Sequence, residues 1–217
     1  MPVDPSTSPP PPSTVAGDAG PLQAQGLACR RGRRLLFKGV CLQLRPGSIT
    51  WLRGRNGSGK TSLLRILAGL STPADGTVLP GGQPLLYIGH ANALKDDLTL
   101  AEAVGFLARL QGLDGALARS RAALGVLGLA SRADAAVRTL SQGQRRRGAL
   151  ARLALDDRPA TWILDEPFDA LDQDSVALLA GLVSAHAARG GAVLMTSHQA
   201  VDLAGAVEFD LELYRAA

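Results

Sequence analysis

The feature that most constrains this chain is the segment GRNGSGKT at residues 54–61, together with its flanks. The apolar run SITWL ends just before it, and SLLRILAGL, which has helical spacing, follows. Such a strand, glycine loop and helix cradle phosphate, because glycines let backbone N–H groups point inward and the helix N-terminus adds partial positive charge. The segment therefore predicts a nucleotide-binding α/β fold. The expected contacts are Gly54, Arg55, Asn56, Gly57, Ser58, Gly59, Lys60, Thr61 and Ser62.

Four polar side chains are expected to carry the chemistry of this site. Lys60 can reach the β- and γ-phosphates of ATP, and the Thr61 hydroxyl can ligate Mg²⁺. Downstream, TWILDEP places Asp165 and Glu166 at the end of an apolar strand. Ligands of an open parallel sheet lie beyond the C-terminal strand ends, where these acids fall. Adjacent strand residues point to opposite faces, so we expect Asp165 in the magnesium shell and Glu166 to activate or polarise a water.

The remaining pattern alternates strands with helices, which predicts a mostly parallel sheet with helices on both faces. Strands are expected at PLLYIG (84–89), TWILD (161–165) and AVLMTS (192–197), and a helix over 173–189. LQAQGLAC and VCLQLRP predict two strands joined by an arginine-rich turn, which form an antiparallel β subdomain. Alanine and leucine at helical spacing between about residues 98 and 140 predict a small helical subdomain.

The composition fits one globular domain. The chain has 217 residues, of which 46% are hydrophobic, and none of its apolar runs reaches the roughly 20 residues of a membrane span. Residues 1–20 are rich in proline and serine and lack the pattern of a secretory signal, so we expect a disordered tail there and a single domain over 21–217. Cys29 and Cys41 lack metal-site spacing and are expected to be reduced, buried, cytosolic thiols.

The charge is mildly basic, with a formal net value of +4. Part of it is clustered, in Arg30, Arg31, Arg33 and Arg34 and again in Arg145, Arg146 and Arg147. Such clusters form solvated faces or bind polyanions, including ATP itself. With only 4% aromatic residues the chain has few stacking platforms for single-stranded nucleic acid, so no nucleic-acid partner is expected.

The segment LSQGQ opens a helix with Ser141 as its N-cap. By itself this would be only a capping signal. It lies between the phosphate loop (residues 54–61) and the strand that leads to Asp165 and Glu166. In this position it resembles the signature motif of ATP-binding cassette (ABC) ATPases. In that family Ser141, Gly143 and Gln144 would face the ATP held by a second subunit. The resemblance implies a two-fold dimer with two ATP molecules in the interface, and it places Asp172 in the loop that crosses that interface.

His198 follows the strand 192–197 and matches the histidine that holds the γ-phosphate in ABC ATPases. Two departures from the family pattern stand out. After PLLYIG the family has a glutamine, whereas this chain has Gly89-His90-Ala91-Asn92, so either His90 takes that place or no side chain does. The first hairpin lacks the aromatic residue that stacks on adenine. Either Arg30 or Arg31 stacks on the base, or apolar contacts hold it.

Within the ABC family, GHANALKDDLTLAEAVGFLARL, WILDEPFDALD and LSQGQRRRGALARL resemble the CcmA proteins, the ATP-binding subunits of the haem exporter in bacterial cytochrome c maturation. The resemblance covers about residues 22–200. It implies an ATPase that sits under integral membrane permease subunits on the cytoplasmic face of the inner membrane. There it would use ATP to release a haem-loaded chaperone. The alternative is the ATP-binding subunit of a transporter with another cargo.

Overall fold

The computed structural model describes residues 20–199 and 201–215. The expected disordered tail at 1–20 therefore lies almost entirely outside the described residues. The core is a five-stranded sheet in the order β5-β6-β7-β3-β8, and each described strand pair in it is parallel. Its strands are β3 (Ile49–Arg53), β5 (Leu85–Ile88), β6 (Thr161–Leu164), β7 (Ala192–Met195) and β8 (Ala206–Asp210).

Strands β6 and β7 occupy the middle of this sheet, and every residue in them is buried. Their apolar runs lack alternation because both faces of the sheet are covered. The four expected strands β3, β5, β6 and β7 are confirmed, whereas β8 at the edge was not anticipated. Only two of its five residues are even half-buried, so its sequence carries little of the apolar signal that identified the others.

A second, antiparallel sheet has the order β2-β1-β4. Its strands are β1 (Leu22–Arg31), β2 (Arg34–Leu44) and β4 (Asp75–Leu79). Along the last part of β2 buried and exposed residues alternate, so Val40 and Leu42 face the core and Cys41 faces solvent. The expectation of two buried thiols is therefore wrong for Cys41, although Cys29 is buried and both are free. The third strand, β4, was not anticipated.

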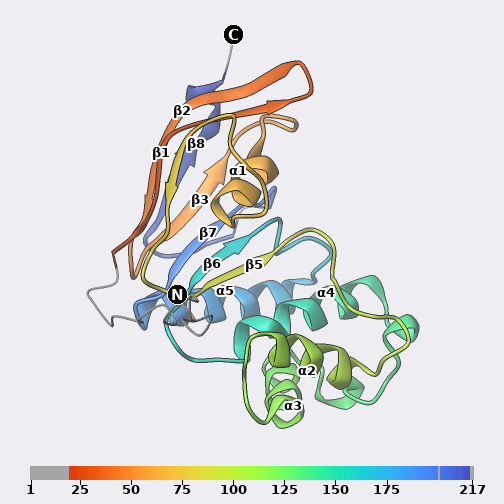
Figure 1. The fold of residues 1–217 in the computed structure, drawn as a ribbon. Coiled ribbons are helices and arrows are strands. Elements are labelled where there is room, and N and C mark those ends of the chain that lie inside the picture. Colours follow the sequence, from red (N-terminus) through yellow and green to blue (C-terminus); the bar gives the residue numbers. More distant parts are fainter. Residues whose placement is uncertain (1–19, 200, 216–217) are drawn as a thin grey trace, which may run out of the picture.

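Helix α1 (Lys60–Leu67) packs beside the antiparallel sheet (Figure 1). Its four apolar residues Leu63, Leu64, Ile66 and Leu67 are at most 2% exposed. They join one hydrophobic cluster with β1, β2 and Ile163 and Leu194 of the parallel sheet. This packing fixes the start of α1, and with it the end of the phosphate loop, against both sheets.

The helical part lies at the other end of the molecule, away from the antiparallel sheet (Figure 1). It contains α2 (Leu100–Leu110), α3 (Ala116–Val126) and two 3₁₀ turns, η1 (Ala130–Arg132) and η2 (Val137–Thr139). Helix α2 begins with a reciprocal cap, in which Thr99 and Glu102 bond each other's backbone N–H. The helical character expected between 98 and 140 is confirmed.

Four further elements complete the fold. Helix α4 (Gln142–Leu150) continues into η3 (Ala151–Ala154), and α5 (Gln173–Ala188) joins β6 to β7. A final 3₁₀ turn, η4 (Leu211–Tyr214), follows β8. None of the described helices is both long and apolar enough to cross a membrane. The architecture is thus an α/β nucleotide-binding fold with a parallel core, an antiparallel β part and a helical part.

Candidate functional site

The phosphate loop joins β3 to α1, and its shape requires glycine at two positions. Gly54 has φ 145° and Gly59 has φ 105°, which side chains disfavour. A Cβ on Gly54 would lie 2.8 Å from Ser58 Oγ, and one on Gly59 would lie 3.0 Å from the Phe37 ring. No side chain caps α1, and its first turn holds no acid. Its first N–H groups can therefore face an anion.

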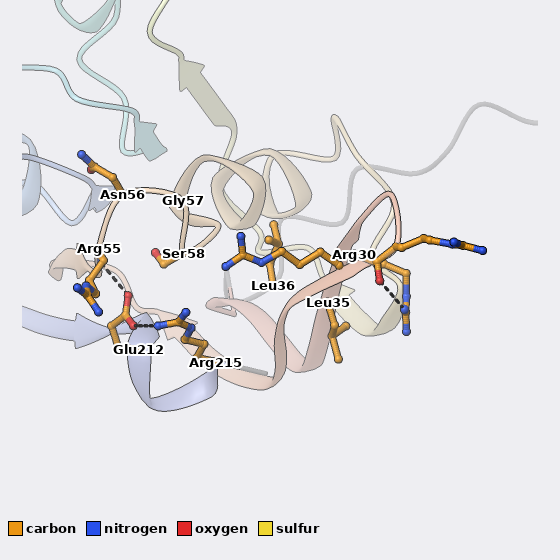
Figure 2. A pocket seen from close by; sticks show the side chains of 11 residues that line it. Arg30, Leu35, Leu36, Arg55, Asn56, Gly57, Ser58, Glu212 and Arg215 are labelled. Carbon is orange, nitrogen blue, oxygen red and sulfur yellow. Dashed lines mark hydrogen bonds and ion pairs between the residues drawn. The ribbon is translucent and has the colours of Figure 1, made fainter. Parts of the chain in front are cut away.

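Two side chains hold the loop in place. Lys60 Nζ donates to Gly54 O at 2.7 Å and to Arg55 O at 3.4 Å. Glu212 in η4 accepts a hydrogen bond from Arg55 N at 2.8 Å and forms an ion pair with Arg215, as Figure 2 shows. No local sequence signal identifies Glu212, because it is 157 residues from Arg55 and belongs to no motif.

The two acids lie next to hydroxyl groups. Asp165 is 3% exposed, and its Oδ1 accepts from Thr61 Oγ1 at 3.3 Å and from Thr196 Oγ1 at 3.1 Å. Thr196 also accepts from Glu166 N at 2.9 Å, so it ties both acids together. Strand β6 ends at Leu164, and Glu166 has φ 48°. A tight turn rather than strand alternation therefore sets the direction of the two carboxylates.

Glu166 lies against His198. The backbone N of His198 donates to Glu166 Oε2 at 3.0 Å, and His198 Nε2 lies 3.4 Å from Oε1. The side chain of Glu166 is 12% exposed and that of His198 is 55% exposed. Burial raises the pKa of the Glu166 carboxyl, and the neighbouring His198 opposes this shift. A carboxylate with a raised pKa is a better proton acceptor than an ordinary one.

These groups surround one cavity of about 420 Å³. It is lined by the phosphate loop, by Asp165, Glu166 and His198, and by Leu36 with Arg31 and Arg34 of the β1–β2 turn. Arg31 borders this cavity, whereas Arg30 and Arg33 line a neighbouring one of about 810 Å³. In Figure 2 Arg30 extends away from the loop, and its Nη1 bonds Arg33 O at 3.4 Å.

The oxygen atoms at this site suit a magnesium ion. Thr61 Oγ1 and Asp165 Oδ1 are hard ligands that already lie 3.3 Å apart. Magnesium takes one or two protein oxygens and completes its shell with phosphate and water, so it does not need a cage of carboxylates. Accordingly, the described residues contain no cluster of three His, Cys, Asp or Glu side chains that could hold a metal.

The signature segment lies apart from this cavity. Ser141 Oγ accepts from Gln144 N at 3.2 Å, and Gln144 Oε1 accepts from Ser141 N at 3.0 Å, so the cap of α4 is complete. Neither residue, nor Gly143, is among the described residues that line the phosphate cavity. A Cβ on Gly143 would lie 2.9 Å from Ala170 O, which fits the close approach of α4 to the turn before α5.

His90 and Asp172 also lie outside the phosphate cavity. His90 lines a small cavity of about 50 Å³ with Asn92, Gln142, Arg146, Asp169 and Ala170. Asp172 is the N-cap of α5, because its Oδ1 accepts from Ser175 N at 2.9 Å. Hydrogen bonds from the side chain and the backbone of Ser175 lower the pKa of the Asp172 carboxyl. Within one chain, therefore, the structure separates these residues from the phosphate loop.

Comparison with known proteins agrees with this geometry. The sequence pattern of the family described as ABC transporter matches residues 37–169. The cytochrome c biogenesis ATP-binding export protein CcmA of Methylococcus capsulatus is 47% identical over 85% of this chain and 94% of its own length. The protein of the same name from Dechloromonas aromatica is 45% identical over 88% of this chain and 99% of its own length.

Solved structures share the fold at lower identity. A putative ABC transporter ATP-binding protein from Pyrococcus furiosus superposes with a TM-score of 0.78 at 20% identity, covering 90% of this chain and all of that one. A dimeric bacterial ABC transporter cassette gives 0.76 at 20% identity, covering 88% and 94%. Since the family pattern spans more than half of the chain and the CcmA relatives match along almost their whole length, this chain belongs to the ABC transporter family as an ABC-type ATPase of the CcmA group.

Proposed function

We propose that the phosphate cavity is the site of ATP hydrolysis and that Glu166 is its catalytic base. The observation that supports this proposal most is the position of the Glu166 carboxylate. His198 N donates to it at 3.0 Å, and it lines the same cavity as Lys60 and Thr61. Glu166 orients a water and accepts its proton as the water oxygen bonds the γ-phosphorus and the bond to the β-phosphate oxygen breaks. His198, exposed and next to Glu166, donates to the γ-phosphate.

The phosphate loop binds the rest of the triphosphate. Lys60 exchanges its bonds with Gly54 O and Arg55 O for phosphate oxygens, which are charged and therefore better acceptors. Thr61 and Asp165 would hold a magnesium ion, and Asn56 and Ser62 line the same cavity. The ion would supply positive charge that stabilises the negative charge of the transferred phosphoryl group.

Each site needs two chains. Ser141, Gly143 and Gln144 lie outside the phosphate cavity of their own chain, so they are free to complete the cavity of a second copy. Two structural neighbours support this arrangement, since one is a dimeric ABC transporter cassette and the other is a dimeric post-hydrolysis state of a cassette bound to ADP and phosphate. In the dimer Asp172, at the start of α5, crosses the interface, and two ATP molecules lie between the copies.

Arg31 is our candidate for the nucleobase contact. Of the two arginines considered from the sequence, only Arg31 borders the phosphate cavity, where Leu36 adds apolar surface. A guanidinium can stack on a purine ring, and it donates hydrogen bonds to the ring's acceptors. Its position on the cavity supports Arg31 over Arg30, and Leu36 would supply the apolar contact that is the alternative way to hold the base.

The ATPase would drive a membrane complex in cytochrome c maturation, as the names of its relatives indicate for them. It would bind integral permease subunits on the cytoplasmic face of the bacterial inner membrane and use ATP to release a haem-loaded chaperone. Helix α2 supports a docking role, because it buries one face yet leaves Phe106 38% and Leu110 69% exposed. Such apolar side chains on one helix are typical of an interaction surface.

Deletion of the gene in its host, followed by staining of membranes for covalently bound haem, tests this assignment. Loss of all c-type cytochromes, restored by the wild-type chain but not by Glu166→Gln, is the expected result. Normal cytochromes in a strain without a second copy would reject cytochrome maturation and leave a transporter with another cargo. Restoration by Glu166→Gln would reject Glu166 as the base.

A further inference from the structure

Arg146, in the second turn of α4, is a charged side chain in an unusual place. It is 4% exposed, although it lies in an arginine run that would be solvated on most helices. Its Nη1 donates to Gly89 O at 3.0 Å, and its Nη2 donates to Asp165 O at 3.0 Å and to Glu166 O at 2.6 Å. A single guanidinium thus joins α4 to the ends of two strands of the parallel sheet.

The three carbonyls share a position just beyond the ladder of β5 and β6. The last regular pair of this ladder is Ile88 with Leu164, and Asp165 N still donates to Ile88 O at 2.8 Å. Past that point the strands separate, so Gly89 O, Asp165 O and Glu166 O lose the partners that a longer ladder would supply. Buried carbonyls need a donor, and Arg146 supplies one to all three.

The backbone around this network is strained. The non-glycine residues with positive φ in the described chain are Ala93, Glu166 and Ala170. Glu166 is held from two sides, since its N–H bonds the Thr196 hydroxyl and its carbonyl bonds Arg146. Strained turns persist only where neighbouring groups determine them. Without Arg146 the turn at Glu166 could relax, and the carboxylate would leave its place beside His198.

The geometry also explains why the residue is arginine. A guanidinium presents N–H groups on separate nitrogen atoms in one rigid plane, so it spans acceptors on two segments more widely than an ammonium group, whose three donors share one nitrogen. Burial lowers the pKa of Arg146, and the carboxylates of Asp169, Asp165 and Glu166 oppose this shift. Three nearby acids therefore compensate the buried cation, and Arg146 bonds the backbone of two of them, Asp165 and Glu166.

We propose that Arg146 is a positioning residue, which fixes the turn carrying Glu166 and couples the direction of α4 to it. Because α4 begins at Ser141, the same guanidinium links the cap presented to a second chain with the base that acts in its own chain. The inference rests on the proposed role of Glu166.

The test compares full-length variants in steady-state ATP hydrolysis. Arg146→Met keeps the length of the side chain but removes the donors, so kcat should fall by about 100-fold while KM for ATP changes by less than about threefold. Arg146→Lys should recover part of kcat, because one or two of the three bonds can reform. Arg119→Met is the matched control, since Arg119 also bonds two backbone carbonyls, Asp114 O and Leu155 O, away from the acids.

Two results would overturn the proposal: wild-type kcat in Arg146→Met, or an equal loss of kcat in folded Arg119→Met. If Arg146→Met does not fold, Arg146→Lys and Arg146→Gln are compared, and turnover in folded Arg146→Gln that equals wild type also rejects it. Because Arg146 acts through Glu166, adding Arg146→Met to Glu166→Gln should change turnover by less than about twofold. If Glu166→Gln alone retains full turnover, the proposed function fails; if it blocks turnover and Arg146→Met does not, only this inference fails.

Discussion

Two groups of arginines in this molecule differ sharply in their exposure to solvent. The turn arginines, Arg30, Arg31, Arg33 and Arg34, are all exposed at the β1–β2 turn. The helix arginines, Arg145, Arg146 and Arg147, lie in α4 and are half-buried or buried. Arg145 donates to Leu140 O and Arg138 O and pairs with Asp96, while Arg146 bonds the ends of β5 and β6.

The difference follows from what each group finds nearby. Antiparallel strands that meet in a tight turn satisfy their own backbone, so the side chains there point to solvent and can meet an anion. At α4 the ends of parallel strands leave carbonyls without partners, and guanidinium groups fill that need. Clustered charge in a sequence therefore does not distinguish a binding surface from internal support. Among the turn arginines we expect Arg31 to affect nucleotide affinity, and we expect Arg146 to affect turnover.

Glu166→Gln should give the largest fall in the rate of ATP hydrolysis. Because Arg146 is proposed to act through Glu166, its removal should lower the rate by no more than this. The amide keeps the shape of the side chain but cannot accept a proton from water. Turnover should fall by about 100-fold or more, since a positioned base contributes about that much, while ATP still binds. Single-turnover hydrolysis and nucleotide titration measure the two quantities. A rate equal to wild type would assign the water-activating role to another group.

Lys60→Ala should give the largest loss of ATP affinity, against which the effect of Arg31→Ala can be compared. Loss of a charge-assisted contact to phosphate should weaken ATP binding by about 10- to 100-fold, corresponding to about 1.5–3 kcal/mol. Calorimetric titration with ATP and magnesium measures this change. Lys38→Ala, on the exposed face of β2, is the control and should bind like wild type. Unchanged affinity in Lys60→Ala would remove the phosphate loop from the proposed site.

Local signals in the sequence were sufficient for the parts of the fold with strong periodicity. The apolar runs of β3, β6 and β7 and the glycines of residues 54–59 act over a few residues, so strand and loop could be predicted. The Ser141 cap also depends only on its neighbours, and the structure contains it. By contrast, the general preference of cysteine for the interior predicts a buried Cys41, while its position in the alternation of β2 places it outside.

Contacts between distant segments could not be predicted in the same way. Thr196 bonds Glu166 and Asp165, which lie 30 and 31 residues away in the sequence. Glu212, in the turn η4 after the last strand, accepts a hydrogen bond from the phosphate loop. Both residues are ordinary in their local sequence. The arginine run alone predicts a solvated face or a polyanion site for Arg146, because no local pattern shows that strand ends 57 and 19 residues away converge on it.

Arg31→Ala tests the turn arginines directly and should have a moderate effect. Loss of a guanidinium that stacks on the base should raise KM for ATP by about three- to tenfold without changing kcat. The effect should shrink at high salt, because Arg31 is exposed and its charge is screened. Arg33→Ala, on the neighbouring cavity, is the matched control with little expected change. A fall in kcat for Arg31→Ala would contradict the division between the two groups.

His90→Gln should change turnover least, and it concerns one of the polar side chains that line the small cavity with Arg146. At pH 8 turnover should stay within about twofold of wild type, because His90 lies outside the phosphate cavity. Glutamine also keeps a hydrogen-bonding side chain at this position, so polar contacts within the small cavity can be preserved.

The acid limb of the pH profile belongs to a different group and should persist in this variant. Burial raises the pKa of Glu166, so its base form is lost as pH falls through a value above that of an ordinary glutamate. Both wild type and His90→Gln should therefore lose activity on acidification, which profiles of kcat from about pH 5 to about pH 9 measure. A fall in kcat well beyond twofold at pH 8 in His90→Gln would give His90 a part in turnover, and the coupling of α4 to the active site would then not depend on Arg146 alone.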